Sequence, residues 1–164
     1  MLEARALHTS TTLTNGQALI AGGITLLPII NLPTVSTTAY LFNPANGNFG
    51  LPSFFSGPRF LHSATALSNG KVLIAGGLSL DLTAFLASGN IEDIVVGTRE
   101  DCLVYTSGFF GSFATVQGMQ VGRAGAAIAS LPNGGALIAG GFQLTLDIGN
   151  GEFVANLTEA ADIL

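Results

Sequence analysis

Residues 69–77 read NGKVLIAGG, and nearly the same string occurs at 15–23 (NGQALIAGG) and at 133–141 (NGGALIAGG). Self-similarity of this kind is the sequence signature of a repeat architecture. In each copy Asn-Gly suits the positive φ of a tight hairpin turn, and the apolar run after it is typical of a strand covered on both faces. The closing glycines predict a close approach of a neighbouring backbone. These glycines are Gly22, Gly23, Gly76, Gly77, Gly140 and Gly141.

The similarity extends upstream to an arginine in every copy. The small and β-branched residues between arginine and turn (TSTTLT, SATALS and AAIASL) predict a strand that pairs with the apolar run. Two copies carry a histidine three residues after the arginine, whereas the third has Ala126 at that place. An apolar residue stands four positions before each arginine. The repeated positions are Met1, Phe55 and Met119, then Arg5, Arg59 and Arg123, then His8 and His62.

Further strands are expected downstream of the glycine pairs. Residues 37–49 (TTAYLFNPANGNF) predict a third strand, a turn and the start of a fourth, and 101–113 (DCLVYTSGFFGSF) repeat this pattern. The third copy supplies only a third strand, at 158–164. We therefore expect a four-stranded antiparallel meander in one domain of residues 1–164. The predicted units are 1–54, 55–118 and 119–164, the last without its fourth strand.

This pattern resembles Kelch repeats. It combines Arg-x-x-His, small β-branched residues, Asn-Gly, an apolar strand, Gly-Gly and a Tyr/Phe-Asn-Pro-x-x-Gly turn, and it is closest to the galactose-oxidase-like kind. The third copy departs from it, with Gly125 and Ala126 where the others have Leu7-His8 and Leu61-His62. The resemblance implies an all-β fold of Kelch-like β-propeller blades, here an incomplete ring of about three.

Three blades leave two flanking faces uncovered, and propellers usually need at least four blades to close. Two explanations remain open. The chain is a piece of a longer propeller, or copies of it complete one another. Two copies would make a six-bladed ring, whereas a head-to-tail contact that does not close would give a filament.

The composition favours association with protein. Apolar residues make up 48% of the 164 residues and charged residues only 9%, against roughly 25% in an average soluble domain. The net charge is −5 and the five cationic side chains are scattered, which argues against nucleic acid. The most apolar stretch, at 24–35, is interrupted by prolines and too short to span a membrane. We expect a homo-oligomer or filament.

The repeated polar residues are expected to be structural. The arginines could line a channel and bind an anion, but an arginine fork more often donates to backbone carbonyls, here between blades. His8 and His62 occupy separate copies of one niche, and neither has a cysteine or carboxylate at ligand spacing, so we expect hydrogen-bonded histidines and no metal site.

Catalytic chemistry is not indicated. Galactose oxidase needs two tyrosines, two histidines and a tyrosine–cysteine link, and the closeness of Cys102 to Tyr105 does not reproduce that set. No G-x-S-x-G motif is present. Residues 147–152 (DIGNGE) miss the alternating spacing of a calcium loop and predict a solvated turn. We expect no enzyme activity and no cofactor.

The connections after Gly-Gly differ most among the copies and are unusually apolar for surface loops, which favours protein contacts through them. The leading hypothesis is a self-associating structural module. The alternative is a carbohydrate- or protein-binding propeller fragment, although the chain has no tryptophan. Scarce lysine and abundant Thr, Ser, Asn and Gly indicate an extracellular or cell-surface protein. Asn156 then heads an N-glycosylation sequon and a glycan is expected there in a suitable host.

Overall fold

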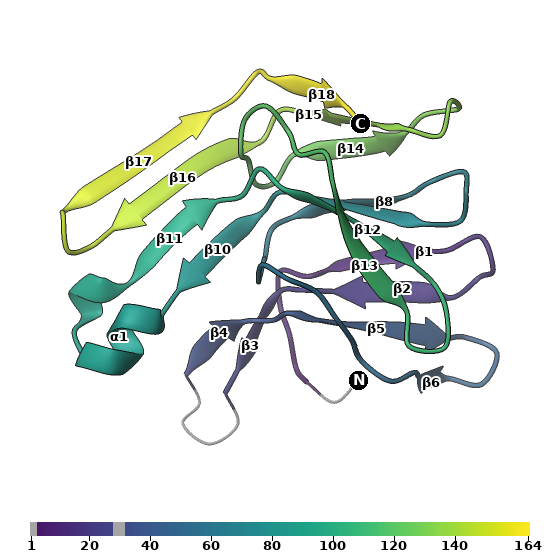
Figure 1. The fold of residues 1–164 in the computed structure, drawn as a ribbon, viewed down its shortest axis with the longest axis horizontal. Coiled ribbons are helices and arrows are strands. Elements are labelled where there is room, and N and C mark those ends of the chain that lie inside the picture. The colour runs from purple at the N-terminus through teal and green to yellow at the C-terminus, as the bar shows by residue number, and fades with distance from the viewer. Residues whose placement is uncertain (1–2, 28–31) are drawn as a thin grey trace.

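The computed structural model describes residues 3–27 and 32–164, and nearly all of its regular structure is antiparallel β-sheet. Strands account for 48% of the described residues and helix for 6%. The predicted all-β class is confirmed. Three small sheets stack in chain order, with the first and third at opposite ends of the stack (Figure 1). Met1 lies outside the described residues, as does part of the apolar stretch at 24–35.

The first two sheets are the predicted four-stranded meanders. In blade 1 the order of the hydrogen-bonded strands is β1–β2–β5–β6, and the short β7 also pairs with β5. In blade 2 the order is β8–β9–β12–β13. The strands of blade 1 are β1 (Thr9–Thr12), β2 (Ala18–Ala21), β5 (Thr38–Asn43), β6 (Asn48–Phe49) and β7 (Ser53–Phe54). Those of blade 2 are β8 (Ser63–Ala66), β9 (Val72–Ala75), β12 (Cys102–Thr106) and β13 (Ser112–Val116).

Blade 3 contains three strands, in the order β14–β15–β18. They are β14 (Ala127–Ser130), β15 (Ala136–Ala139) and β18 (Ala161–Ile163). The first two strands of every blade share one register relative to the repeat. Thr9 faces Ala21, Ser63 faces Ala75, and the third blade pairs Ala127 with Ala139 in the same way.

The Asn-Gly turns form hairpins, but only their glycines take positive φ. In blade 1, Gly16 has φ 81° and its N–H donates to the carbonyl of Leu13 at 2.9 Å. The N–H of Leu13 donates to Gln17 O at 2.8 Å. This is a β-turn followed by a left-handed glycine, a common hairpin bulge. Asn15 instead accepts a bond from the Gln17 N–H through its side-chain oxygen, at 3.0 Å.

The connections after Gly-Gly, expected as surface loops, are β-hairpins, and this expectation was wrong. β11 pairs with β16, which joins two hairpins of neighbouring blades into one sheet, β10–β11–β16–β17. This hairpin sheet extends away from the blades, on the left of Figure 1. The hairpins are β3 (Ile24–Leu26) with β4 (Pro33–Val35), β10 (Leu78–Asp81) with β11 (Val95–Thr98), and β16 (Phe142–Asp147) with β17 (Glu152–Leu157); α1 (Thr83–Ser88) and the 3₁₀ turn η1 (Ile91–Asp93) lie between β10 and β11.

The core is divided among the junctions between these sheets. One cluster lies between blades 1 and 2, a second between blades 2 and 3, and a third where the hairpins leave the blades. Phe55 and Met119, the repeated apolar residues before the arginines, are buried in the first and second clusters. The faces that meet at each junction are therefore apolar, and stability depends on neighbouring blades covering them.

Candidate interaction surfaces

A buried arginine precedes the first strand of each blade. In blade 2, Arg59 Nη1 donates to the carbonyl oxygens of Gly76 at 3.3 Å and Asp101 at 3.2 Å, and Nη2 donates to Asp101 Oδ2 at 2.6 Å. Arg99 Nε donates to the other carboxylate oxygen at 2.8 Å. Burial opposes ionisation of Asp101, but bonds from the two arginines hold its pKa below the usual value. The arginine thereby ties the end of β9 to the start of β12.

The same arrangement recurs in blades 1 and 3. Arg5 Nη1 donates to the carbonyls of Gly22 and Thr38, each at 3.0 Å, and Arg123 donates to the carboxylate of Asp162. The acceptors belong to the arginine's own blade, which corrects the expectation of bonds between blades. They lie where the second strand ends and the third begins, so their carbonyls need a donor outside the strand ladder.

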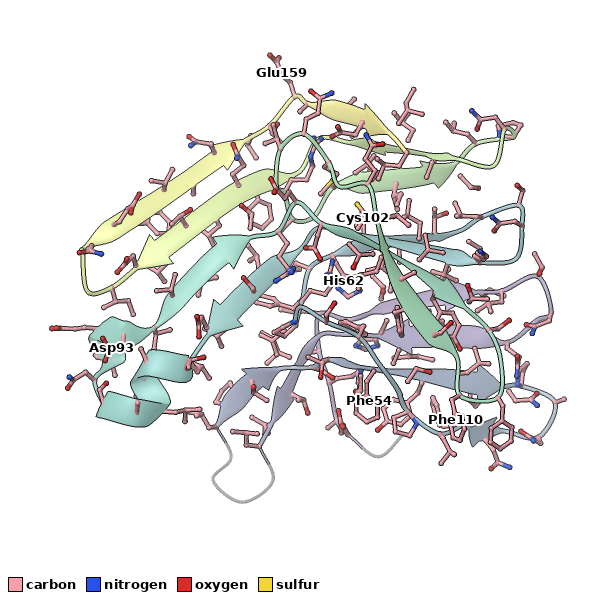
Figure 2. All side chains as sticks on the ribbon, viewed as in Figure 1. Phe54, His62, Asp93, Cys102, Phe110 and Glu159 are labelled. Atoms are coloured by element: carbon pink, nitrogen blue, oxygen red, sulfur yellow. The ribbon has the colours of Figure 1, made fainter. Side chains whose placement is uncertain are left out.

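The two histidines lie at different kinds of position. His62 is 5% exposed at the junction of blades 1 and 2, where its Nε2 is 2.7 Å from Thr9 Oγ1 (Figure 2). Burial lowers the pKa of His62 to about 3, so the ring is neutral near pH 7. Burial also lowers the pKa of His8, next to Arg5. At the junction of blades 2 and 3, Ala126 takes the place of histidine and its carbonyl accepts a bond from Ser63.

Five of the six repeated glycines lie where neighbouring backbone leaves no room for a side chain. All six have positive φ, between 59° and 99°. A Cβ on Gly22 would lie 2.6 Å from Arg59 O, and one on Gly76 would lie 2.3 Å from Arg123 O; both carbonyls belong to the next blade. At the matching Gly140 of blade 3, the nearest atom would be Thr158 O at 3.9 Å.

The outer face of blade 3 is apolar and open. Leu19 and Leu73 face the next blade and are 1% and 2% exposed, whereas Leu137, at the same repeat position, is 36% exposed. Ile163 is 68% exposed. Its counterpart in blade 2, Val104, packs against the cluster between blades 2 and 3. We call this surface the blade 3 outer face: Leu137, Ala139, Ala161 and Ile163.

The opposite end of the stack carries the complementary face. Ser10 of β1 is exposed, while its counterparts in blades 2 and 3, Ala64 and Ile128, pack against the two inter-blade clusters. On the corresponding side of blade 1 the β1 residues Ser10 and Thr12 are exposed, whereas Ile20 of β2 is only 9% exposed. We call this surface the blade 1 outer face: Ser10, Thr12, Ala18 and Ile20.

The hairpin sheet has its own open edge. All six residues of β17 are exposed, with Phe153 at 67% and Leu157 at 90%. Asn156 of the sequon lies on this exposed strand. The far end of the sheet, near Asp93, lies away from the blades (Figure 2). An exposed edge strand with large apolar side chains is a template for pairing with more protein.

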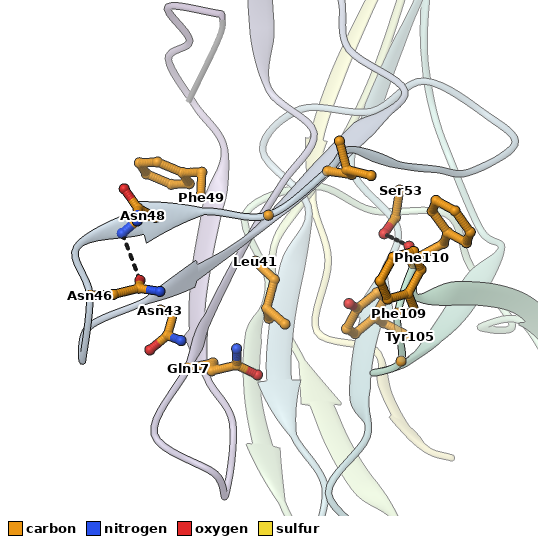
Figure 3. A pocket seen from close by; sticks show the side chains of 13 residues that line it. Gln17, Leu41, Asn43, Asn46, Asn48, Phe49, Ser53, Tyr105, Phe109 and Phe110 are labelled. Carbon is orange, nitrogen blue, oxygen red and sulfur yellow. Dashed lines mark hydrogen bonds between the residues drawn. The ribbon is translucent and has the colours of Figure 1, made fainter.

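A groove of about 260 Å³ opens at the rim, between the β5–β6 turn and the β12–β13 turn (Figure 3). Leu41 lies between two groups of side chains that converge on it. Gln17 and Asn43 supply amides on one side, and the aromatic rings of Tyr105 and Phe109 lie on the other. The thirteen lining residues include no charged side chain. Such a lining suits an uncharged polar ligand with an apolar face.

Cys102 and Tyr105 do not form one site. Cys102 belongs to the cluster between blades 2 and 3, and Tyr105 to the cluster between blades 1 and 2, on the other face of β12. Burial raises the pKa of the Cys102 thiol to about 11. Tyr40 lies in blade 1, where its hydroxyl is 3.5 Å from Glu3 Oε1. The oxidase arrangement is therefore not reproduced by these residues.

Asp147 and Glu152 flank the turn between β16 and β17. Asp147 Oδ1 accepts a bond from the Asn150 N–H at 3.0 Å, and Oδ2 accepts one from the Asn150 side-chain amide at 2.8 Å. Among residues 3–27 and 32–164, no group of three or more His, Cys, Asp or Glu side chains is placed to hold a metal ion. In the same residues, no helix is long and apolar enough to cross a membrane.

Stacked antiparallel sheets, packed face to face on their neighbours, define a propeller-like fold. The chain is similar to the solved structure of YjhT, a β-propeller protein, with a TM-score of 0.63 and 17% sequence identity. The match covers 95% of this chain and 52% of that one, so the chain spans about half the length of YjhT. At this identity the likeness shows the fold alone. No protein-family model and no curated protein matches the sequence, so the Kelch resemblance stays a prediction.

Proposed function

We propose that this chain is a non-enzymatic, Kelch-type structural module that self-associates through its uncovered blade faces and apolar hairpins. The observation that carries the proposal is the contrast in exposure at one repeat position, 2% for Leu73 and 36% for Leu137. The sequence keeps an apolar residue there whether or not this chain supplies a neighbour to cover it. Burial of such a face stabilises a complex because apolar surface leaves water.

The hairpin sheet adds to the proposal. Phe153 and Leu157 present apolar side chains at an open edge, where backbone groups are also free to pair. Few charges oppose contact between copies, since only 9% of the residues are charged. The products we expect are a closed dimer or, where the contact propagates without closing, a filament at the cell surface.

The test is the solution mass of this chain, measured by light scattering after size exclusion at a series of concentrations. A dimer or larger species that dissociates on dilution supports the proposal, and negative-stain images separate closed particles from filaments. A folded monomer at every concentration, up to about 100 μM, refutes it. A Kd weaker than that corresponds to less than about 6 kcal/mol of binding free energy.

Carbohydrate binding is a second candidate, favoured by the groove at the rim. Amides from Gln17 and Asn43 can bond sugar hydroxyls, while Phe109, 88% exposed, offers an aromatic face to the ring carbons. An array of neutral glycans tests it, with Phe109→Ala as the variant and Phe54→Ala, an exposed phenylalanine that does not line the groove, as the matched control. Binding that both variants retain would contradict the assignment of the groove.

A further inference from the structure

We propose that the blade 3 outer face docks on the blade 1 outer face of a second copy, head to tail, through the contacts that already join neighbouring blades within the chain. This inference rests on the proposed self-association and names its partner surface. The proposal is based on unpaired backbone groups at both ends of the described stack, on the free space around Gly140, and on the side chains of the two outer faces.

Two backbone hydrogen bonds recur at both junctions between blades. The first runs from a glycine of one blade to an arginine carbonyl of the next: Gly23 N–H to Arg59 O, and Gly77 N–H to Arg123 O, each at 2.9 Å. The second runs back: Leu61 N–H to Leu7 O at 3.1 Å, and Gly125 N–H to Leu61 O at 2.8 Å. Each junction is therefore closed by one bond in each direction.

In the part of the chain that the structure describes, each end of the stack has one free donor and one free acceptor at the positions that form these bonds. Blade 3 offers the donor Gly141 N–H and the acceptor Gly125 O, and blade 1 offers the acceptor Arg5 O and the donor Leu7 N–H. Among the described residues, none of these four groups has a hydrogen-bond partner. A second copy placed like the next blade would pair Gly141 with Arg5 and Leu7 with Gly125. Both ends would then be satisfied by the bonds seen inside the chain.

Gly140 shows that blade 3 retains space for such a neighbour. At the two internal junctions the equivalent glycines lie against the arginine carbonyl of the next blade, where a Cβ would overlap at 2.6 Å and 2.3 Å. Gly140 meets nothing closer than 3.9 Å. The carbonyl of Arg5 from a second copy would occupy this space. The positive φ of Gly140, 66°, also favours glycine.

The side chains of the two faces complement each other in the same orientation. Within the chain, Leu73 on one blade faces Ile138 on the next, both in the cluster between blades 2 and 3. Across the proposed contact, Leu137 takes the place of Leu73, and Ile20, which is 9% exposed in one chain, takes that of Ile138. A contact between two copies of the blade 3 outer face would not reproduce these pairs. The repeat thus favours a heterologous contact over an isologous one.

The length comparison indicates where such a contact closes. The chain spans 52% of the YjhT chain, so two copies have about the length of that one propeller chain. Two head-to-tail contacts would then join two copies into a ring without free blade faces. We therefore expect the self-associated species to be a dimer.

A mixing experiment tests this orientation. Ser10→Lys places a charge on the blade 1 outer face, and Ile163→Lys places one on the blade 3 outer face; both positions are exposed in one chain, so each variant should fold. Circular dichroism and thermal melting check the fold. If either variant unfolds, Thr12→Lys and Ala161→Lys replace the pair. Phe109→Lys, on the β12–β13 turn, is the control for an added lysine at an exposed apolar position.

Each variant alone should be monomeric, with dimerisation weakened at least about a hundredfold, because a lysine would be buried without a partner at both contacts. An equimolar mixture should form a heterodimer through one contact, since the intact blade 3 face of Ser10→Lys meets the intact blade 1 face of Ile163→Lys. The second contact of that pair would hold both lysines and should stay open, so the heterodimer should be weaker than the parent dimer. Phe109→Lys should dimerise like the parent chain. A parent chain that is monomeric overturns the proposed function itself. A parent dimer that persists in Ser10→Lys, or two monomeric variants that do not complement each other, overturns the head-to-tail contact alone.

Discussion

Blades 2 and 3 carry nearly the same apolar strand, yet one is enclosed and the other is not. Val72, Leu73, Ile74 and Ala75 are at most 3% exposed, whereas blade 3 alternates, with Ile138 at 0% and Leu137 at 36%. Side chains that face the previous blade are covered in both, and those that face the next blade are covered only in blade 2. Burial of the side chains that face the next blade is therefore set by that blade. Each blade carries the residues for two neighbours.

The largest loss of stability is expected from replacing the buried arginines, and it should be the same in blades 2 and 3. Arg59→Met and Arg123→Met should each lower the free energy of unfolding by about 4 kcal/mol, because each leaves one carboxylate oxygen and a backbone carbonyl without the arginine donor. Urea denaturation measures this loss. Since each arginine bonds within its own blade, the two losses should be alike. A much smaller loss for Arg123 would mean that its site depends on a covering blade.

The equivalent leucines of blades 2 and 3, Leu73 and Leu137, should differ in how much they contribute to stability. Leu73→Ala should cost about 3 kcal/mol in urea denaturation, because it leaves a cavity between blades 2 and 3. Leu137→Ala should cost less than about 1 kcal/mol in the monomer, since part of that side chain is already in water. Equal losses under monomeric conditions would contradict the assignment of an open face. At concentrations where copies associate, Leu137→Ala should weaken association instead.

Gly76 of blade 2 and the equivalent Gly140 of blade 3 should tolerate a side chain to different degrees. Gly76→Ala and Gly140→Ala both place a side chain at positive φ, which costs about 1 kcal/mol. Gly76→Ala should cost about 2 kcal/mol more, because its Cβ would overlap the carbonyl of Arg123. Thermal melting of dilute samples compares the two. If they melt at the same temperature, the overlap at Gly76 is relieved by movement of the neighbouring blade.

His62, at the junction of blades 1 and 2, adds a pH dependence that the junction of blades 2 and 3 lacks. Its pKa is about 3 when folded and about 6.5 when unfolded, so the unfolded chain binds the proton first as pH falls below 6.5. The free energy of unfolding should therefore fall by about 2 kcal/mol between pH 7 and pH 5. In His62→Gln this slope should largely disappear, leaving the contribution of His8, whose pKa is also lowered. An unchanged slope would place the titrating group elsewhere.

Most of the blade strands could be predicted from the sequence because their signals are local. The Asn-Gly turns and the apolar runs after them lie within about ten residues, and the register between first and second strands follows from the turn. Short third strands at 38–43 and 102–106 were also predicted, from their position before a turn.

The hairpin sheet could not be predicted in the same way. The pairing of Val96 with Leu146 joins segments from different repeats, and no turn residue between them marks it. The apolar side chains of these segments indicate contact with protein in general, but not which strands pair. The arginine acceptors were missed for a related reason: the bonds to Gly76 and Asp101 depend on how two strand ends meet in space.

The paired bonds at each junction also bear on how such a chain could change in length during evolution. Because every junction uses the same glycine donor and the same arginine carbonyl, duplication of one repeat within the gene inserts a blade that already fits both neighbours. Deletion of a repeat leaves ends that still match. Recombination between the near-identical NG segments thus alters blade number in whole steps, without a new interface having to arise by point mutation.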